Sequence, residues 1–189
     1  ARWYAAVRRH RVPVLRRHAI AAVEPRPDGL RVRTHPVDAI GRPVPDTPGP
    51  ALAADALAVG HGLVPNTEIT RLLGAAHSYS ADAGGWTATR DALGRSSVPG
   101  LYVAGDGAGI TGARPAQYEG RLAGLAAAAD LGGLTPATLA ARAAGPRRQL
   151  GWTAPFGAAV ARLLALRPGQ VDAIPADVTV CRCEDITRA

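Results

Sequence analysis

The chain has 189 residues, of which 47% are hydrophobic, so it holds enough apolar material for a packed core, and disorder of the whole chain is not expected. All 22 basic side chains are arginines, against 15 acidic ones, which gives a formal charge of +7. Nine of the arginines lie in residues 1–33 beside only Glu24 and Asp28, with few aromatic residues among them, so the charge excess is local and nucleic-acid binding is disfavoured.

In the first sixty residues, the pattern predicts a helix end and a small antiparallel sheet. Residues 25–29 combine two prolines with Gly29, which is a strong turn signal. The alternation of apolar and polar residues after this turn is typical of a half-buried strand. In chain order we expect a helix end at 1–10, strands at 19–23 and 30–34, a loop at 41–50 and a buried strand at 54–59.

The rest of the chain is expected to be richer in helix. Pro115 suits the first turn of a long alanine-rich helix, where a missing N–H has no cost, and Gly132 and Gly133 would end that helix. In chain order we expect a helix at 66–73, a small strand at 86–88, an apolar strand at 101–104, and helices at 115–131, 136–144 and 146–166, followed by a linker punctuated by Pro168 and Pro175.

Neither the apolar stretches nor the cysteines indicate a membrane or an export route. The longest apolar stretches, 122–129 and 158–166, are shorter than the roughly 20 residues needed to span a bilayer. The first residues lack the apolar core of a signal peptide. Cys181 and Cys183 are too close in sequence for an easy disulfide. We therefore expect a cytoplasmic protein without a membrane span.

The most informative segment joins the apolar strand at 101–104 to the long helix. Asp106 follows this strand directly, between Gly105 and Gly107. In open α/β sheets ligands bind at this edge, where a carboxylate accepts hydrogen bonds from ligand hydroxyls and glycines allow a phosphate to approach the backbone. The amides at the start of the next helix favour an anion or an electron-rich carbonyl. A strand-end turn capped by Asp106 would give the same pattern.

Residues 96–106, SSVPGLYVAGD, resemble the second flavin-binding signature of the two-dinucleotide-domain flavoproteins, the glutathione-reductase-like superfamily. The later segment 119–124, EGRLAG, is similar to a helix of the same family. The resemblance implies that Asp106 binds the ribityl hydroxyls of FAD, with Gly105 and Gly107 beside it. It also implies that the amides of Gly112 and Ala113 face the flavin pyrimidine.

A second match lies upstream, in the order that the family has. Residues 55–67 resemble the segment that leads from the nicotinamide-binding domain back to the flavin domain. By this resemblance Gly60 lies where the two domains meet and needs no side chain, and it is a further candidate for cofactor binding. Asn66 is a good helix N-cap. His61 is interpreted as a polar turn residue.

The two cysteines form a C-x-C pair that could bind one metal or cluster. A [2Fe–2S] cluster needs four thiolates, and zinc also takes four ligands, so the pair alone is compatible with two free thiols. The segment 180–187, VCRCEDIT, closely resembles the opening of the bacterioferritin-associated-ferredoxin-like [2Fe–2S] domain. This domain follows the flavin domain in the larger subunits of hydrogen cyanide synthase, opine oxidase and hydroxyproline dehydrogenase complexes. Cys181 and Cys183 would then be half of a ligand set.

The predicted fold class is α/β: part of a two-dinucleotide-binding-domain flavoprotein fold, with an antiparallel meander and a C-terminal helical linker. We expect the tail of an NAD(P)-type domain at 1–64, the C-terminal part of an FAD domain at 65–133, a helical linker at 134–175 and the start of a [2Fe–2S] domain at 176–189. No glycine-rich dinucleotide fingerprint occurs before Val12, so the chain is expected to be a fragment, inactive alone.

The resemblance implies a subunit that passes electrons from amine or amino-acid oxidation through FAD and, in the full-length protein, a [2Fe–2S] cluster. NAD(P) is a further candidate cofactor, and a second flavoprotein subunit is the expected partner in a hetero-oligomer. No catalytic residue can be named. The alternatives are an NAD(P)H-dependent flavin reductase of the same fold and, from another class, a basic nucleic-acid-binding module.

Overall fold

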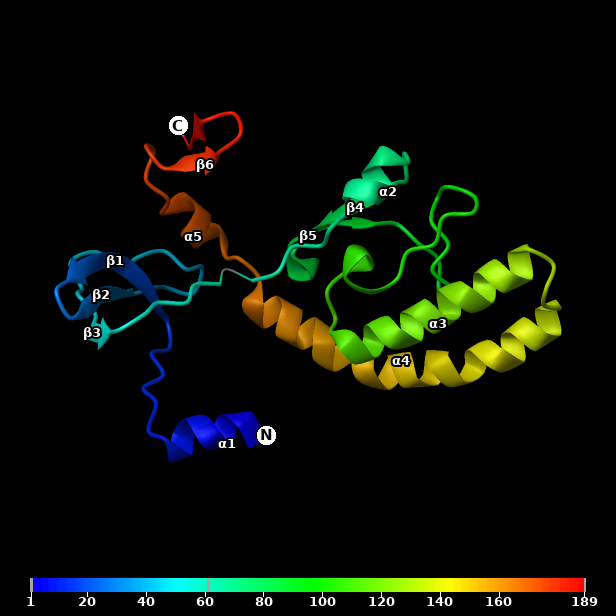
Figure 1. The fold of residues 1–189 in the computed structure, drawn as a ribbon, viewed down its shortest axis with the longest axis horizontal. Coiled ribbons are helices and arrows are strands. Elements are labelled where there is room, and N and C mark those ends of the chain that lie inside the picture. The colour runs from blue at the N-terminus through cyan, green and yellow to red at the C-terminus, as the bar shows by residue number, and fades with distance from the viewer. Residues whose placement is uncertain (1, 61, 189) are drawn as a thin grey trace. The chain divides into compact units, whose positions relative to one another are not determined.

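The computed structural model describes residues 2–60 and 62–188, so His61 lies outside the described residues. Helices and antiparallel sheets alternate along the chain, which confirms a mixed α/β fold (Figure 1). The chain divides into two compact units, one formed by residues 1–59 with 167–189 and the other by residues 60–166. Each unit has its own packing and is described separately.

The first unit begins with helix α1 (Arg2–Arg9) and continues into the predicted antiparallel meander. Its strands are β1 (His18–Arg26), β2 (Gly29–Pro36) and β3 (Ala51–Ala54), paired in the order β1-β2-β3. The β1–β2 turn requires glycine at position 29. Its φ is +136°, and a Cβ there would lie 2.7 Å from the carbonyl oxygen of Ala54. The turn predicted at 25–29 is thus confirmed, although β1 continues to Arg26.

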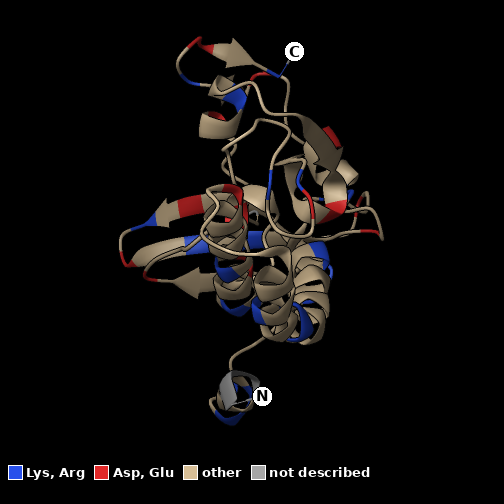
Figure 2. Cartoon of the chain, turned by 90° about the vertical axis from the view of Figure 1, so that its right-hand side faces the viewer, with Lys and Arg blue, Asp and Glu red and all other residues tan. Residues whose placement is uncertain are grey.

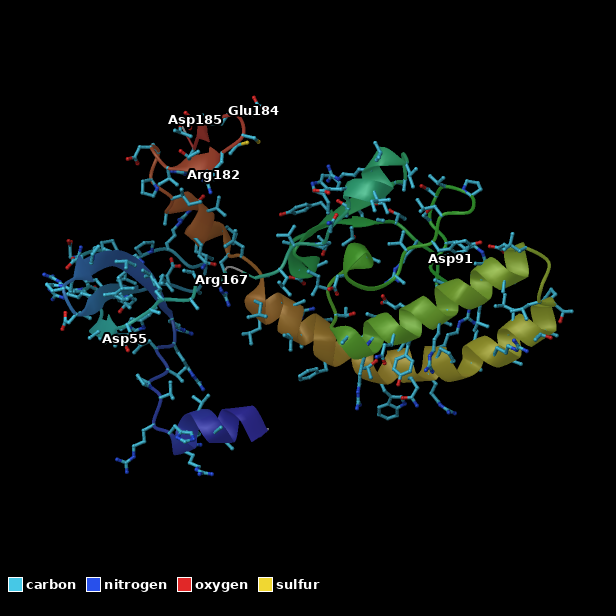
Figure 3. All side chains as sticks on the ribbon, viewed as in Figure 1. Asp55, Asp91, Arg167, Arg182, Glu184 and Asp185 are labelled. Carbon is cyan, nitrogen blue, oxygen red and sulfur yellow. The ribbon has the colours of Figure 1, made fainter. Side chains whose placement is uncertain are left out.

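The buried strand expected at 54–59 is wrong. The third strand ends at Ala54, which pairs with Leu30 of β2. Beyond Leu30, only Gly29 remains in β2 before the turn to β1. Residues after Ala54 therefore have no neighbouring strand to pair with, and Val59 is 61% exposed. Asp55 follows the last paired residue directly (Figure 3).

The C-terminal part of the same unit folds back on the loop that follows β2. Helix α5 (Pro168–Asp172) lies in the stretch expected to be a linker, and the Gly169 N–H donates to the Ile40 carbonyl at 2.9 Å. Arg42 and Asp172 form an exposed ion pair at 2.9 Å. A short hairpin of β6 (Thr179–Cys181) and β7 (Ile186–Thr187) follows.

The second unit is built on two antiparallel helices joined by a short loop, α3 (Ala113–Asp130) and α4 (Pro136–Leu164) (Figure 1). Its core is aliphatic, with Leu122 and Ala126 of α3 buried against Ala143 of α4 and against Leu93. The smaller elements are α2 (Glu68–Leu72), the hairpin of β4 (His77–Ser80) and β5 (Gly85–Ala88), and the 3₁₀ turns η1 (Ala81–Ala83) and η2 (Gly105–Ala108).

The strand expected at 101–104 does not form a regular ladder. Its apolar character is confirmed at Val103, which is 5% exposed. Among the described residues the segment pairs only with 94–96, through one antiparallel bridge between Arg95 and Tyr102. The Val103 N–H donates to the Gly94 carbonyl at 2.7 Å. Residues 97–100 form a tight loop between the two paired segments, so the pairing is too short to form a strand. The 101–104 segment nevertheless leads directly into Gly105.

The two helices expected at 136–144 and 146–166 are one continuous helix, α4, with Pro146 and Pro155 in its interior. A proline inside a helix removes one hydrogen bond and costs about 3 kcal/mol, which is why a break was expected. Packing compensates here, because α4 lies along α3, and Ala143 and Gly157 are both buried. The predicted end of α3 near Gly132 is confirmed, with Gly132 at a φ of +79°.

Basic and acidic positions occur on strands as well as on helices (Figure 2). In residues 2–60 and 62–188 no helix combines the length and the apolar character needed to cross a membrane.

Candidate functional site

The turn η2 holds three of the predicted site residues together. Gly105 is buried with a φ of +70°, and a Cβ there would lie 3.3 Å from the Ala116 side chain. A Cβ on Gly107 would lie 3.2 Å from the Asn66 carbonyl oxygen. Both glycines are thus needed for close packing of the turn. Between them Asp106 is exposed, and no hydrogen bond or ion pair within the described residues engages its carboxylate. It is free to accept hydrogen bonds from a ligand.

Behind this turn the Glu119 side chain binds the backbone. Glu119 lies on α3 with 6% of its surface exposed, and its Oε2 accepts the Gly105 N–H at 2.7 Å. Its Oε1 accepts from Arg90 Nη2 at 2.8 Å, and Arg90 Nη1 donates to the Val103 carbonyl at 3.2 Å. The backbone on the N-terminal side of Asp106 is therefore held at two points by one ion pair.

The start of α3 presents uncapped amides. Gly112 is the N-cap residue, with a φ of +98°, and no side chain caps the helix at this end. The first residue of the helix is Ala113, which is exposed, as Gly112 is. Because the first N–H groups of a helix have no partner inside it, this end can donate hydrogen bonds to a carbonyl or an anion. The structure thus places Gly112 and Ala113 together, on the helix that follows η2.

A cavity of about 510 Å³ opens beside the start of α3. Its wall is mainly apolar and carries no charged side chain; Thr111 and Gly112 border it, whereas Asp106 does not. The Thr111 hydroxyl is buried and has no hydrogen-bond partner among the described residues. The rest of the wall comes from residues 62–64, from the stretch 79–84, from Ile110, and from the end of α4 with residues 165–166 after it.

The remaining predicted residue, Gly60, belongs neither to η2 nor to the start of α3. It is exposed in an irregular segment, and a Cβ there would meet nothing within 4 Å. The cap of the next helix also differs from the expectation, because Thr67 is the N-cap of α2, and Asn66 instead accepts the Glu68 N–H through its side chain at 3.1 Å.

Sequence reasoning missed three polar groups near the turn and the cavity. Glu119 belongs to the EGRLAG motif, but its spacing of thirteen residues from Asp106 does not predict a contact with Gly105. Arg90 and Thr111 lie in loops without a pattern that marks them. A charged residue at a position of α3 that faces the core, between Pro115 and Leu122, was the available signal for Glu119.

The cysteine pair lies on the β6–β7 hairpin, whose connecting turn carries Arg182, Glu184 and Asp185 (Figure 3). The two Sγ atoms are 3.1 Å apart. The hydrogen bond with the Cys183 thiol, helped by the backbone N–H groups of Glu184 and Cys183, lowers the pKa of Cys181. Within the part of the chain that the structure describes, no group of three or more His, Cys, Asp or Glu side chains is arranged so that it could hold a metal ion. These residues therefore do not provide the four ligands of a [2Fe–2S] cluster.

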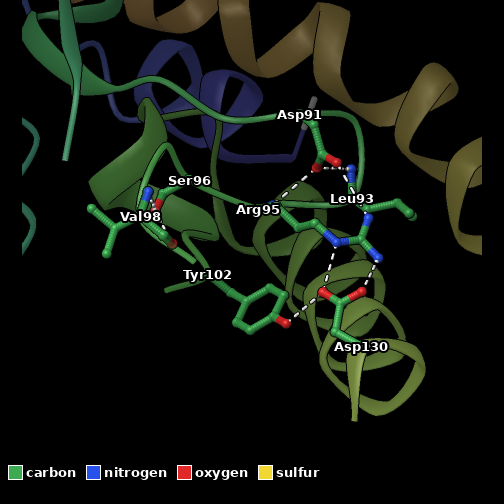
Figure 4. Close-up of polar contacts among 7 residues, drawn as sticks. All are labelled: Asp91, Leu93, Arg95, Ser96, Val98, Tyr102 and Asp130. Atoms are coloured by element: carbon green, nitrogen blue, oxygen red, sulfur yellow. Dashed lines mark hydrogen bonds and ion pairs between the residues drawn. The ribbon is translucent and has the colours of Figure 1, made fainter. Parts of the chain in front are cut away.

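An ion pair fixes the C-terminal end of α3 to the loop that precedes the 101–104 segment (Figure 4). Arg95 donates to both carboxylate oxygens of Asp130 at 2.7 Å, and the Tyr102 hydroxyl donates to the same carboxylate at 2.6 Å. The hydrogen bonds from Arg95 and then Tyr102 lower the pKa of Asp130 from 3.8 to about 2.

We expect this pair to make the stability of the 60–166 unit depend on pH. Because the folded-state pKa of Asp130 lies below its unfolded value, its stabilising effect is present above pH 4 and is lost as the pH falls through about 2. Asp130→Asn should lower Tm at pH 7 by a few degrees, and this difference from the wild type should shrink toward pH 2. Thermal melts followed by circular dichroism at several pH values would check it. A difference in Tm that is constant with pH would contradict the assignment.

Two curated relatives match most of this chain. Hydrogen cyanide synthase subunit HcnB of Pseudomonas protegens is 37% identical over 137 residues, which are 72% of this chain and 29% of the relative. HcnB of Pseudomonas aeruginosa is 34% identical over 168 residues, which are 88% of this chain and 36% of the relative. This chain is related to HcnB.

The matches to HcnB confirm the expected relation to a hydrogen cyanide synthase subunit. The chain spans between 29% and 36% of the length of the HcnB subunits that it matches. No protein-family model matches the chain, and no solved structure matches it. The relation to HcnB therefore rests on sequence identity.

Proposed function

We propose that this chain is part of an FAD-dependent oxidoreductase subunit and that the η2 turn with the start of α3 binds the flavin. The observation that carries the proposal is the Asp106 carboxylate, which is exposed and without a partner in the described structure, in a turn that its two flanking glycines pack tightly. This group suits a ligand with several hydroxyls, such as the ribityl chain of FAD. The uncapped start of α3 suits the carbonyl edge of a flavin ring.

Bound FAD would supply the redox chemistry, and the chain would hold and orient it. In this proposal Asp106 accepts hydrogen bonds from the ribityl hydroxyls, and the amides at Gly112 and Ala113 donate to the ring. Gly105 and Gly107 allow the backbone to approach. No residue of the described chain is assigned to proton transfer from the substrate.

The name of the relatives supports an amine or amino acid as the substrate class and a second subunit as the partner. Hydrogen cyanide contains a carbon–nitrogen triple bond, and its formation from an amine or amino acid is an oxidation of a carbon–nitrogen single bond. We therefore propose amine or amino-acid oxidation for the whole protein. Because the relatives are named as subunits of a synthase, we also propose that it works with a second subunit.

The domain boundaries belong to the same proposal. Residues 1–64 would be the tail of an NAD(P)-type domain, 65–133 the end of the FAD domain and 134–175 a helical linker. Residues 176–189 would begin a [2Fe–2S] domain to which Cys181 and Cys183 give two ligands. The other two ligands would have to come from outside the described residues.

The test is FAD binding by Asp106→Ala in the full-length polypeptide that contains this chain, with its partner subunit if the complex requires it. A hydrogen bond to a charged group contributes about 1.5–3 kcal/mol, so the Kd for FAD should rise about ten- to a hundredfold. Quenching of flavin fluorescence measures this Kd.

The matched control for Asp106→Ala is Asp55→Ala, which removes another exposed carboxylate, in the other unit, and should leave the Kd unchanged. Wild-type protein that binds no flavin, or an Asp106→Ala variant with wild-type affinity, would refute the proposal.

A further inference from the structure

A buried ion pair lies directly behind the proposed flavin site, and its geometry suggests a role beyond packing. Among the residues whose burial the structure describes, Glu119 is the only charged residue that is buried, with 6% of its surface exposed. Its partner Arg90 is also largely buried, with 22% of its side chain exposed. Removal of two charges from water carries a desolvation cost that often exceeds their mutual attraction, so stability alone is a weak reason for such a pair.

The contacts of the pair converge on the backbone that presents Asp106. Glu119 binds the N–H of Gly105, the residue immediately before Asp106, at 2.7 Å. Arg90 binds the carbonyl of Val103, two residues further back, at 3.2 Å. Since Arg90 and Glu119 are themselves joined at 2.8 Å, the pair spans the segment 103–105 and anchors it to α3.

The segment held in this way has a conformation that needs support. Gly105 has a φ of +70° and packs against Ala116, so its backbone sets the direction in which the next residue leaves the turn. No hydrogen bond within the described structure fixes the Asp106 carboxylate itself. Its orientation therefore depends on the backbone, and the backbone depends on Glu119 and Arg90.

We infer that Glu119 and Arg90 are positioning residues, which orient the Asp106 carboxylate toward the hydroxyls of a sugar-alcohol chain. The inference rests on the proposed function. It assigns to the buried pair a specific contribution to flavin affinity, separate from its contribution to folding.

Glu119→Gln tests the inference with almost no change in volume. The amide has one oxygen and one NH₂ group, so either Arg90 or the Gly105 N–H would face a donor in place of an acceptor. The turn should shift, and in the full-length polypeptide the Kd for FAD should rise about tenfold or more, with a changed visible circular dichroism of the bound flavin. In the flavin-free protein, hydrogen exchange at the Gly105 amide should become faster.

The matched control is Asp130→Asn, which breaks an ion pair at the other end of the same helix without touching the turn. It should leave the Kd within about twofold of the wild type. A Glu119→Gln variant whose Kd and flavin spectrum equal those of Asp130→Asn overturns the inference and leaves the proposed function intact.

The same experiment also covers a Glu119→Gln variant that does not fold and a wild-type protein that binds no flavin. If Glu119→Gln does not fold, Arg90→Lys replaces it, because lysine keeps the charge but cannot bind Val103 and Glu119 through one planar fork. The same comparison of Kd and spectrum with Asp130→Asn then supports or overturns the inference. Wild-type protein that binds no flavin refutes the proposed function, and the inference that rests on it fails with it.

Discussion

Replacement of Leu122 by alanine should lower the free energy of unfolding of the 60–166 unit by about 2–5 kcal/mol, the range measured for large-to-small changes in cores. Leu122 is 2% exposed and lies at the centre of the contact between α3 and α4, with Leu93, Ala126 and Ala143 around it. Ala126 and Ala143, two of these three neighbours, have little apolar volume to fill the space, so we expect the upper half of that range.

Urea unfolding followed by circular dichroism at 222 nm measures this effect, because α3 and α4 account for most of the helix in the chain. Leu131→Ala is the matched control. Leu131 is the C-cap residue of the same helix and is 88% exposed, so its loss should change the free energy of unfolding by no more than about 0.5 kcal/mol. Equal midpoints for the two variants would show that the α3–α4 contact is not the core of this unit.

The features that the sequence predicted well are set by local chemistry. Gly29 in the β1–β2 turn, Gly132 after α3 and Gly105 before Asp106 each have a positive φ that few residues other than glycine adopt, so composition alone marks them. The antiparallel meander follows from alternation on β2 and from the tight turn before it.

The predictions that failed depend on partners distant in sequence. The extent of β3 is set by where β2 ends, and the 101–104 segment pairs only briefly with 94–96. Pro146 would end an isolated helix, yet α4 continues because it packs along α3. Apolar runs and prolines in the sequence do not indicate which distant segment will pair with them or pack against them in the fold.

The candidate site likewise has one part that the sequence predicts and another part that it does not. Gly105, Asp106 and Gly107 form one turn, and Gly112 and Ala113 begin one helix, because these residues are close in sequence. The Arg90–Glu119 pair joins residues 29 positions apart, and the cavity wall combines residues near 63, 80, 111 and 160. Only the fold brings these groups together, so the support behind the turn could not be seen in the sequence.

The second variant with a large expected effect on stability is Gly157→Ala, at the point where α4 lies close to the start of α3. A Cβ placed on Gly157 would lie far inside contact distance of the Thr111 carbonyl oxygen, and Gly157 is buried in α4. Alanine in a helix interior is normally more stable than glycine by roughly 0.5–1 kcal/mol. Here the clash with a backbone atom should reverse the sign, so that Gly157→Ala lowers the free energy of unfolding by about 1–3 kcal/mol.

Gly151→Ala is the matched control for Gly157→Ala, because a Cβ at Gly151, on the same helix, would meet nothing within 4 Å. This variant should be as stable as the wild type or more stable, by about 0.5–1 kcal/mol. The same urea unfolding separates the two variants. If Gly157→Ala were as stable as Gly151→Ala, the close approach of α4 to Thr111 would be wrong.

Gly157→Ala should also affect the candidate site, because Thr111 borders the cavity beside the start of α3. To accommodate the new methyl group, α4 must move away from the Thr111–Gly112 backbone, and both residues line the 510 Å³ cavity together with Phe156 and Val160 of α4. The start of α3 would then lose its apolar cover. On the proposed function, Gly157→Ala in the full-length polypeptide should therefore weaken FAD binding, whereas Gly151→Ala should not. Flavin affinity that is unchanged in a Gly157→Ala protein of lowered stability would show that α4 does not support the proposed flavin site.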